Sequence, residues 1–486
     1  MLIDPEAPAA PADPATGPAT GRFAGREAVR LAVLCAAQFM LVLDVVVVNV
    51  ALPSIQSDLA IPDARLSLTA IAYTLTFGSL LVVFGRAGDL VGRRRLFLGG
   101  LGVFTVASLA TGLAPGPWVL FASRAAQGVG AAMVSPSALA LLTTGFPEGA
   151  RRNRALGLWG AVGAGGAIAG QLLSGLITDV VGWRGIFLVN VPVGIAVVLA
   201  ARATVEESRE SAEPGTSRPR LDVGGAVLLT AGLALTILAL TRVAERVGLT
   251  AGAAALAIGA AALLALFAHR ERRHPEPLVR FSLFRLPGVR VGILTLVLNA
   301  GALGGAMFFT TLYLQRVLHY SPLAVGFAFA PITLLILLVA PRAGALTSRF
   351  GVRRLLTVGL AVLALGMVVL ARVPEGGSYA VDVLPGLLLL AVGSGLAYAP
   401  TFVAGTSGVA ATEQGVASGL LNSAQELGAA VGLAVLTTVA ATAGGSGAGG
   451  SAAGYRAGYL VAAVMMAVAA LVAWRASAGL GRADGG

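Results

Sequence analysis

The sequence has few charged side chains and almost none of the residues that build disulfides or metal sites. Of its 486 residues, 57% are hydrophobic and only 12% are charged. A soluble protein carries roughly 25% charged residues because its surface must be hydrated. Cys35 is the only cysteine, and the three histidines are scattered along the chain. These absences exclude a soluble enzyme, a disulfide scaffold and a metal site, and they indicate a chain that lies in lipid.

Lysine is absent, and all 34 basic residues are arginine. A phosphate-binding loop of the G-x-x-x-x-G-K-[ST] type needs a lysine, so direct coupling to ATP is excluded and no cofactor is expected. The energy source must then be an ion gradient or the substrate gradient. The net charge of +11 could suggest nucleic acid. The arginine-rich loops lack the aromatic residues that nucleic-acid binding needs, so we expect no such partner.

Fourteen apolar stretches are long enough to cross a bilayer as helices, which takes about 20 residues each. They predict an all-α polytopic membrane protein. The predicted spans are 29–52, 67–87, 96–114, 118–143, 155–178, 184–202, 222–241, 249–268, 289–312, 323–346, 355–372, 383–405, 416–440 and 456–475.

The distribution of arginine predicts the orientation of the chain. With the N-terminus inside, 26 arginines and 15 acidic residues fall on the cytoplasmic side, against 7 and 6 on the outside. The positive-inside rule therefore places both termini in the cytoplasm. The exclusive use of arginine, with abundant alanine and glycine, is typical of a GC-rich bacterial genome, so we expect a multi-pass protein of the bacterial plasma (inner) membrane.

Two arginine-rich loops resemble each other and divide the chain into two halves, as in transporters built from repeats. The first contains Gly85, Asp89, Gly92, Arg93, Arg94 and Arg95. The second contains Gly344, Ser348, Gly351, Arg353 and Arg354, and its arginine pair is in register with Arg94 and Arg95. The predicted segments are a disordered cytoplasmic tail 1–27, a six-helix bundle 28–203, a linker 204–220, an inserted helix pair 221–270, a linker 271–288, a second six-helix bundle 289–476 and a tail 477–486.

Five motifs occur in an order that resembles the major facilitator superfamily, in particular its fourteen-span drug:proton antiporter branch. They are Leu43–Pro53, Gly85–Arg95, Arg124–Gly130, Gly160–Gly175, and Trp183-Arg184 with Asn190–Pro192. Ala87, Leu90, Gln171 and Ser174 depart from the usual residues of these motifs. The resemblance covers residues 28 to 475 and implies two pseudo-symmetric bundles of six helices plus two inserted helices. It also implies transport driven by the proton gradient.

Away from the ends of the predicted spans, three charged residues lie within them, where a charge costs at least a few kcal/mol. Two of them, Asp44 and Arg124, lie at compatible depths, so we expect them to communicate and to couple transport to protons. Gln127 shares a helix face with Arg124, and we place it with Asn49 in the substrate cavity. The alternatives are a carboxylate that stabilises its own helix and an arginine that clamps two helices.

The third embedded charge, Glu426, lies near the predicted midplane with Asn422 and Gln425 beside it. A mostly apolar cavity with a central carboxylate suits lipophilic cations, so we assign these three residues to the substrate cavity. The alternative is a protonated glutamic acid that hydrogen-bonds a neighbouring helix.

The glycines of the fifth predicted span recur at helical spacing, which lets two helices approach closely. The resemblance implies that this face opens and closes during antiport, although close packing alone would also account for it. Gln171 stands where the family usually has proline, which removes a kink. The residues assigned to this motif are Gly163, Gly166, Gly170, Gln171 and Gly175.

The first arginine-rich loop is predicted to lock the two halves together at the cytoplasmic face. Asp89 would accept hydrogen bonds from a helix N-terminus or a nearby arginine, and these break when the gate opens. Ser348 carries no charge, so we expect the corresponding contact in the second half to be weaker. The inserted spans 222–241 and 249–268 contain no embedded charge, and we assign them a structural or lipid-facing role.

These features predict a monomeric, proton-coupled antiporter that exports small amphipathic drugs or antibiotics by alternating access. Its partners are the substrate, protons and the lipid bilayer. A transporter dedicated to one endogenous metabolite, working as exporter or importer, is the alternative within the same fold. An intramembrane enzyme would need a cluster of catalytic residues at membrane depth, which the sequence does not offer.

Overall fold

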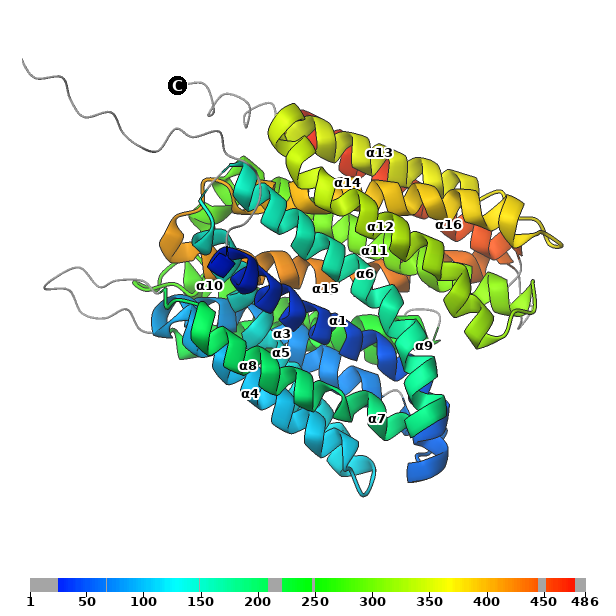
Figure 1. Cartoon of the computed structure of the whole chain (residues 1–486), viewed down its shortest axis with the longest axis horizontal. Helices are drawn as coiled ribbons and strands as arrows, with labels where there is room; N and C mark the ends of the chain where they lie inside the picture. Colours follow the sequence, from blue (N-terminus) through cyan, green and yellow to red (C-terminus); the bar gives the residue numbers. More distant parts are fainter. Residues whose placement is uncertain are drawn as a thin grey trace, which may run out of the picture.

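In the computed structural model, the described residues are 25–66, 68–147, 149–208, 221–246, 250–444 and 452–476. Every regular element within these ranges is helical (Figure 1). Residues 1–24 of the predicted tail 1–27, residues 209–220 of the predicted linker 204–220, and the whole predicted tail 477–486 lie outside the described residues.

The first half of the chain forms one helical bundle. Its helices are α1 (Gly25–Leu59), the short α2 (Asp63–Leu66), α3 (Leu68–Val91), α4 (Arg93–Gly112), α5 (Pro117–Gly145), α6 (Ala150–Val181), α7 (Trp183–Leu188) and α8 (Asn190–Thr204). The inserted pair follows as α9 (Val223–Arg246) and α10 (Ala251–Glu271), which pack against each other.

The second half forms the other bundle, which lies beside the first in Figure 1. Its elements are η1 (Phe281–Arg285), α11 (Pro287–Arg316), α12 (Pro322–Phe350), α13 (Val352–Leu370), η2 (Tyr379–Val383), α14 (Leu384–Thr406), η3 (Ala411–Glu413), α15 (Gln414–Gly444) and α16 (Ala452–Ala476).

Thirteen helical segments of the described chain are long and apolar enough to cross a membrane, and each matches one of the predicted spans. The remaining predicted span, 155–178, lies within α6, a continuous helix of 32 residues. The all-α polytopic fold is therefore confirmed. The count of fourteen spans and the cytoplasmic position of the termini remain predictions.

The internal repeat is visible in the backbone. Gly92 joins α3 to α4 with φ +121°, and Gly351 joins α12 to α13 with φ +82°. Both values lie in a region that side chains with a Cβ rarely adopt, so each sharp turn requires glycine. The two turns mark one end of the molecule, the arginine-rich end, which carries Arg93–Arg95 and Arg353–Arg354.

The two bundles meet mainly along two helix pairs, α3 with α15 and α6 with α12, and α5 with α15 and α6 with α14 add further contacts. Their backbones come closest near the arginine-rich end. A methyl group added at Gly85 would lie 2.3 Å from the carbonyl oxygen of Gly415, and one at Gly344 would lie 2.3 Å from that of Asn153. Small residues thus allow backbone-to-backbone contact between the bundles where a side chain would separate them.

Replacing Gly85 by alanine is expected to destabilise the contact between the bundles. The added methyl group must displace backbone atoms, and overpacking of this kind costs about 1–3 kcal/mol. Gly102→Ala is the matched control, because nothing lies within 4 Å of its added Cβ and alanine favours helix by about 0.5–1 kcal/mol. Thermal unfolding of the purified variants should show a lower midpoint for Gly85→Ala alone. Equal midpoints would contradict the close contact.

Candidate functional site

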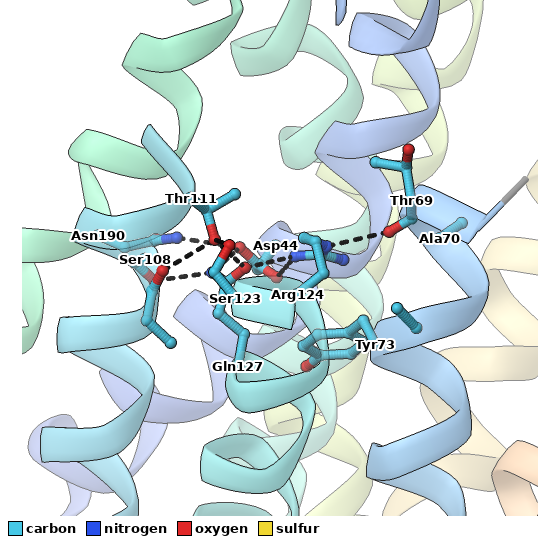
Figure 2. A network of polar contacts seen from close by, with 12 residues as sticks. Asp44, Thr69, Ala70, Tyr73, Ser108, Thr111, Ser123, Arg124, Gln127 and Asn190 are labelled. Carbon is cyan, nitrogen blue, oxygen red and sulfur yellow. Dashed lines mark hydrogen bonds and ion pairs between the residues drawn. The ribbon is translucent and has the colours of Figure 1, made fainter. Parts of the chain in front are cut away.

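Two of the predicted embedded charges form a buried ion pair (Figure 2). Nη1 of Arg124 on α5 lies 2.5 Å from Oδ2 of Asp44 on α1. Asp44 is 2% exposed and Arg124 is 1% exposed. The structure therefore brings these two residues into direct contact.

Two side-chain amides complete the hydrogen bonding of the Asp44 carboxylate. Nε2 of Gln127 donates to Oδ1 at 3.0 Å, and Nδ2 of Asn190 on α8 donates to the same oxygen at 3.1 Å. Oε1 of Gln127 accepts from Nη1 of Arg124 at 3.0 Å. Gln127, assigned to the substrate cavity from its helix face, thus bridges the ion pair instead and does not line the cavity. The residue that sequence reasoning missed, Asn190, lies in one of the five motifs.

Arg124 has further partners that hold its guanidinium in place. Nε donates to the carbonyl oxygen of Thr69 at 3.2 Å, and the guanidinium lies 4.6 Å from the ring centroid of Tyr73. An arginine cannot lose its proton, so only Asp44 can change charge within this pair. Without the charge of Asp44, the partners of Arg124 are neutral: Oε1 of Gln127, the carbonyl oxygen of Thr69 and the ring of Tyr73.

Hydroxyl groups extend the network to α4. Nε2 of Gln127 also donates to Oγ of Ser108 at 2.8 Å, and Oγ1 of Thr111 lies 3.1 Å from Oε1 of Gln127 and 2.9 Å from Oγ of Ser123. Figure 2 shows these side chains converging around Asp44. The network therefore connects α1, α3, α4, α5 and α8 through one carboxylate.

A central cavity of about 350 Å³ lies between the two bundles. Helices α1, α3, α5 and α6 of the first bundle and α11, α12, α14 and α15 of the second line it, mostly with apolar side chains. Its polar lining includes the three predicted residues of α15 and several that the sequence did not indicate. These polar residues are Gln38, Tyr73, Ser135, Asn299, Ser394, Tyr398, Asn422, Gln425 and Glu426.

Glu426 has no hydrogen bond or ion pair within the described chain. Its neighbour Asn422 uses Nδ2 to donate to the carbonyl oxygen of Ser418, at 2.8 Å. The interhelical hydrogen bond considered as an alternative for Glu426 is therefore not formed in this structure. The buried oxygens Oε1 of Gln38 and Oδ1 of Asn299 also lack a partner in the described chain. These two oxygens and the carboxylate of Glu426 are acceptors in the cavity lining, which suits a cation or a hydrogen-bond donor.

The glycines of α6 contact helices of both bundles. A Cβ at Gly163 would lie 3.3 Å from the hydroxyl of Tyr398 on α14, and one at Gly166 would lie 3.2 Å from the ring of Phe39 on α1. Gly170 is buried. These contacts describe packing, and the gating role of this face remains a prediction. Asn49, Gln171 and Gly175 lie outside the residues whose side chains the structure describes.

Asp89 joins the bundles at the arginine-rich end. Its carboxylate accepts from the backbone N–H groups of Gly415 and Val416, at 3.0 and 3.1 Å, and from Nε of Arg93 at 2.9 Å. Arg93 also donates to the carbonyl oxygen of Ala411. Asp89 belongs to α3, and its side chain is fully buried against the first turn of α15. The dipole of α15 favours a negative charge at that position.

The neighbouring parts of the two arginine-rich loops form weaker contacts. Arg94 donates to the carbonyl oxygen of Arg202 within the first bundle, at 2.9 Å, and does not reach the second. In the second loop, Oγ of Ser348 accepts from Nδ2 of Asn153 across the bundles at 3.0 Å, in an exposed position. A neutral, exposed hydrogen bond contributes less than a buried, charged one.

Comparisons with known proteins identify the family. The profile described as Major Facilitator Superfamily matches residues 34–433. The chain is 41% identical to the cephamycin export protein CmcT of Amycolatopsis lactamdurans, over 82% of each chain. It is 40% identical to the puromycin resistance protein pur8 of Streptomyces alboniger, over 82% of this chain and 79% of that one. The human organic anion transporter MFSD10 has the same fold, with a TM-score of 0.65 and 17% identity over 93% of this chain and all of that one.

Removing the arginine of the ion pair is expected to cost more stability than removing the pair. Arg124→Gln leaves a buried carboxylate without its counter-charge, which costs about 3–5 kcal/mol. In the double variant Asp44→Asn/Arg124→Gln no charge is left unpaired, so much of that loss should be recovered. The free energies of unfolding of the wild type, both single variants and the double variant measure this coupling. Additive losses would show that the two side chains do not interact.

Neutralising Asp89 is expected to loosen the arginine-rich end. Asp89→Asn removes the charge shared by Arg93 and the start of α15, and loss of a buried charged partner costs about 2 kcal/mol or more. Spin labels at the exposed positions Val91 and Thr412, in a Cys35→Ser background, should then report longer distances between α3 and η3. Asp58→Asn, on the opposite end of the molecule, serves as the control. An unchanged distance distribution in Asp89→Asn would exclude the proposed lock.

Proposed function

The chain belongs to the major facilitator superfamily, and we propose that it exports small amphipathic drugs or antibiotics in exchange for protons. The observation that carries the coupling is the buried Asp44–Arg124 pair. The nature of the cargo is supported by the names of the relatives, which include an export protein for cephamycin and a resistance protein for puromycin. The central cavity, apolar with a free carboxylate at Glu426, supports amphipathic substrates that carry a positive charge.

The proton acts on the arrangement of helices around Asp44. While Asp44 is charged, it holds Arg124, Gln127 and Asn190, and so ties α1 to α5 and α8. When a proton neutralises the carboxylate, the attraction of Arg124 falls and the helices can adopt a second packing. A proton thereby shifts the equilibrium between two states of the transporter, to the extent that it binds one state better.

The contacts of Asp89 contribute to the free energy that the change between the two states requires. Its contacts hold the arginine-rich end closed, the end that the arginine distribution predicts to be cytoplasmic. Opening toward the cytoplasm breaks these buried bonds, and binding of substrate or of a proton must compensate. Alternating access then consists of relative movement of the bundles 28–203 and 289–476 around the central cavity. We propose that one monomer in the bacterial plasma membrane carries out the cycle.

A transporter for one endogenous metabolite, exporting or importing, would use the same fold and the same coupling. A broad drug exporter and a transporter for one metabolite differ in the range of compounds that they transport. Efflux of a panel of antibiotics and of cationic dyes from cells, compared between the wild type and Asp44→Asn, distinguishes a broad exporter from a dedicated one. Efflux of a single compound would favour the dedicated transporter.

Proteoliposomes test the coupling directly. Addition of a cationic dye such as ethidium should dissipate an imposed pH gradient in the absence of sodium, and Asp44→Asn should reduce this proton flux by about tenfold or more, because no other group in the network can take up the proton. Binding of the dye should change by less than about threefold, which is under 1 kcal/mol. Retained proton flux in Asp44→Asn would exclude Asp44 as the coupling residue.

Asp58→Asn is the matched control for this experiment. Asp58 lies on the same helix as Asp44 but outside the membrane-spanning segment, and it is half exposed in its pair with Arg184. Hydrogen bonds from Arg184 and from Nε1 of Trp183 lower the pKa of Asp58 below its ordinary value, so it stays charged at neutral pH. Its loss removes an exposed ion pair and the hydrogen bond from Trp183, neither of which belongs to the Asp44 network, and should leave proton flux unchanged.

A further inference from the structure

A second cavity of about 410 Å³ meets the central cavity at Glu426, which lines both. The second cavity lies between α3, α9, α11 and α15, and its lining includes Thr74, Leu240, Phe308 and Thr437. Thr437 is 11 residues beyond Glu426 on α15, or about 16 Å along the helix. The second cavity therefore runs from Glu426 away from the arginine-rich end.

The inserted helix α9 forms a wall of this cavity. Ile237, Leu240 and Thr241 of α9 line it, and α9 packs on both α3 and α15. A Cβ added at Gly78 on α3 would lie 2.9 Å from Cδ1 of Ile237 and 3.8 Å from Cβ of Glu426. The glycine thus lets the inserted helix approach the embedded carboxylate. This position goes beyond the structural or lipid-facing role expected for the inserted pair.

The polar groups of the second cavity offer only acceptors. The hydroxyls of Thr74, Thr241 and Thr437 each donate to a carbonyl oxygen one turn earlier in their own helix, at 3.2, 2.9 and 2.7 Å. Their protons are therefore engaged, and only lone pairs remain for a ligand. The other lining side chains are apolar apart from the carboxylate of Glu426. Such a lining disfavours an anion and suits a hydrocarbon group attached to a cation.

We propose that the second cavity is a subsite for the apolar arm of lipophilic cations, with their charged end held at Glu426 and with α9 setting the length of arm that fits. This subsite rests on the proposed function, since it assumes that the central cavity binds transported compounds. It assigns the inserted helix pair a direct part in substrate selection. A compact cation uses the central cavity alone, whereas a cation with a long alkyl arm uses both.

Two phosphonium cations that differ only in the length of one arm test the proposal. Binding of methyltriphenylphosphonium and dodecyltriphenylphosphonium to the purified protein is measured by scintillation proximity. Leu240→Trp fills the second cavity and should weaken binding of the dodecyl compound by about tenfold, which corresponds to roughly two methylene groups that are no longer buried. Binding of the methyl compound should change by less than about twofold. Leu240→Ala, which enlarges the cavity, should shift the preferred arm to a longer one.

Ile258→Trp on α10 is the matched control for the added indole. Ile258 is 71% exposed and does not line the cavity. It lies about as far from the first residue of α10 as Leu240 lies from the last residue of α9. It should leave the binding of both cations unchanged, whereas Glu426→Gln should weaken both.

The outcomes separate the subsite from the proposed function. If the wild type binds both cations and Leu240→Trp weakens them equally or not at all, the subsite is excluded and the exporter proposal stands. If the wild type binds neither cation, the assignment of the central cavity to cationic substrates fails, and the subsite fails with it.

Discussion

A charge within the apolar part of a membrane must be matched by neighbouring groups, and the rest of the site follows from this constraint. Asp44 meets it with Arg124, Gln127 and Asn190, which come from two other helices. Several helices are thereby held by one carboxylate. The carboxylate of Asp44 is a group that can gain a proton, and the packing of the helices around it depends on its contacts. Coupling protonation to movement requires both properties in one group.

Three buried or cavity-lining carboxylates have three different surroundings, and each suits a different task. Asp44 is paired with an arginine, and proton coupling is the role proposed for it. Asp89 is held by Arg93 and by the first N–H groups of α15, so it ties one bundle to the other. Glu426 has no partner in the described chain and lines both cavities, so its charge is available to a ligand. The surroundings of these carboxylates, and not their residue types, distinguish the three proposed roles.

The inserted helices show how a segment without embedded charge can still contribute to a site. The residues of α9 are apolar or carry hydroxyls that donate within the helix, so nothing in the segment itself indicates a ligand. Its contact with α3 and α15 places it beside Glu426. The relatives named for cephamycin export and puromycin resistance match over four-fifths of this chain.

The sequence by itself determined the class of fold, the positions of thirteen observed spans and the repeat that places Gly92 and Gly351 at equivalent turns. These depend on local properties, namely the length of apolar runs and the need for glycine at positive φ. The sequence also predicted that Asp44 and Arg124 lie at compatible depths in the membrane, because depth can be estimated by counting residues along a helix. Only the tertiary structure decided that Gln127 bridges the ion pair, that Asn190 completes it, and that α9 lines a cavity. Helices apolar on nearly every face give no sign of which side meets which neighbour, so these contacts depend on packing between segments far apart in the sequence.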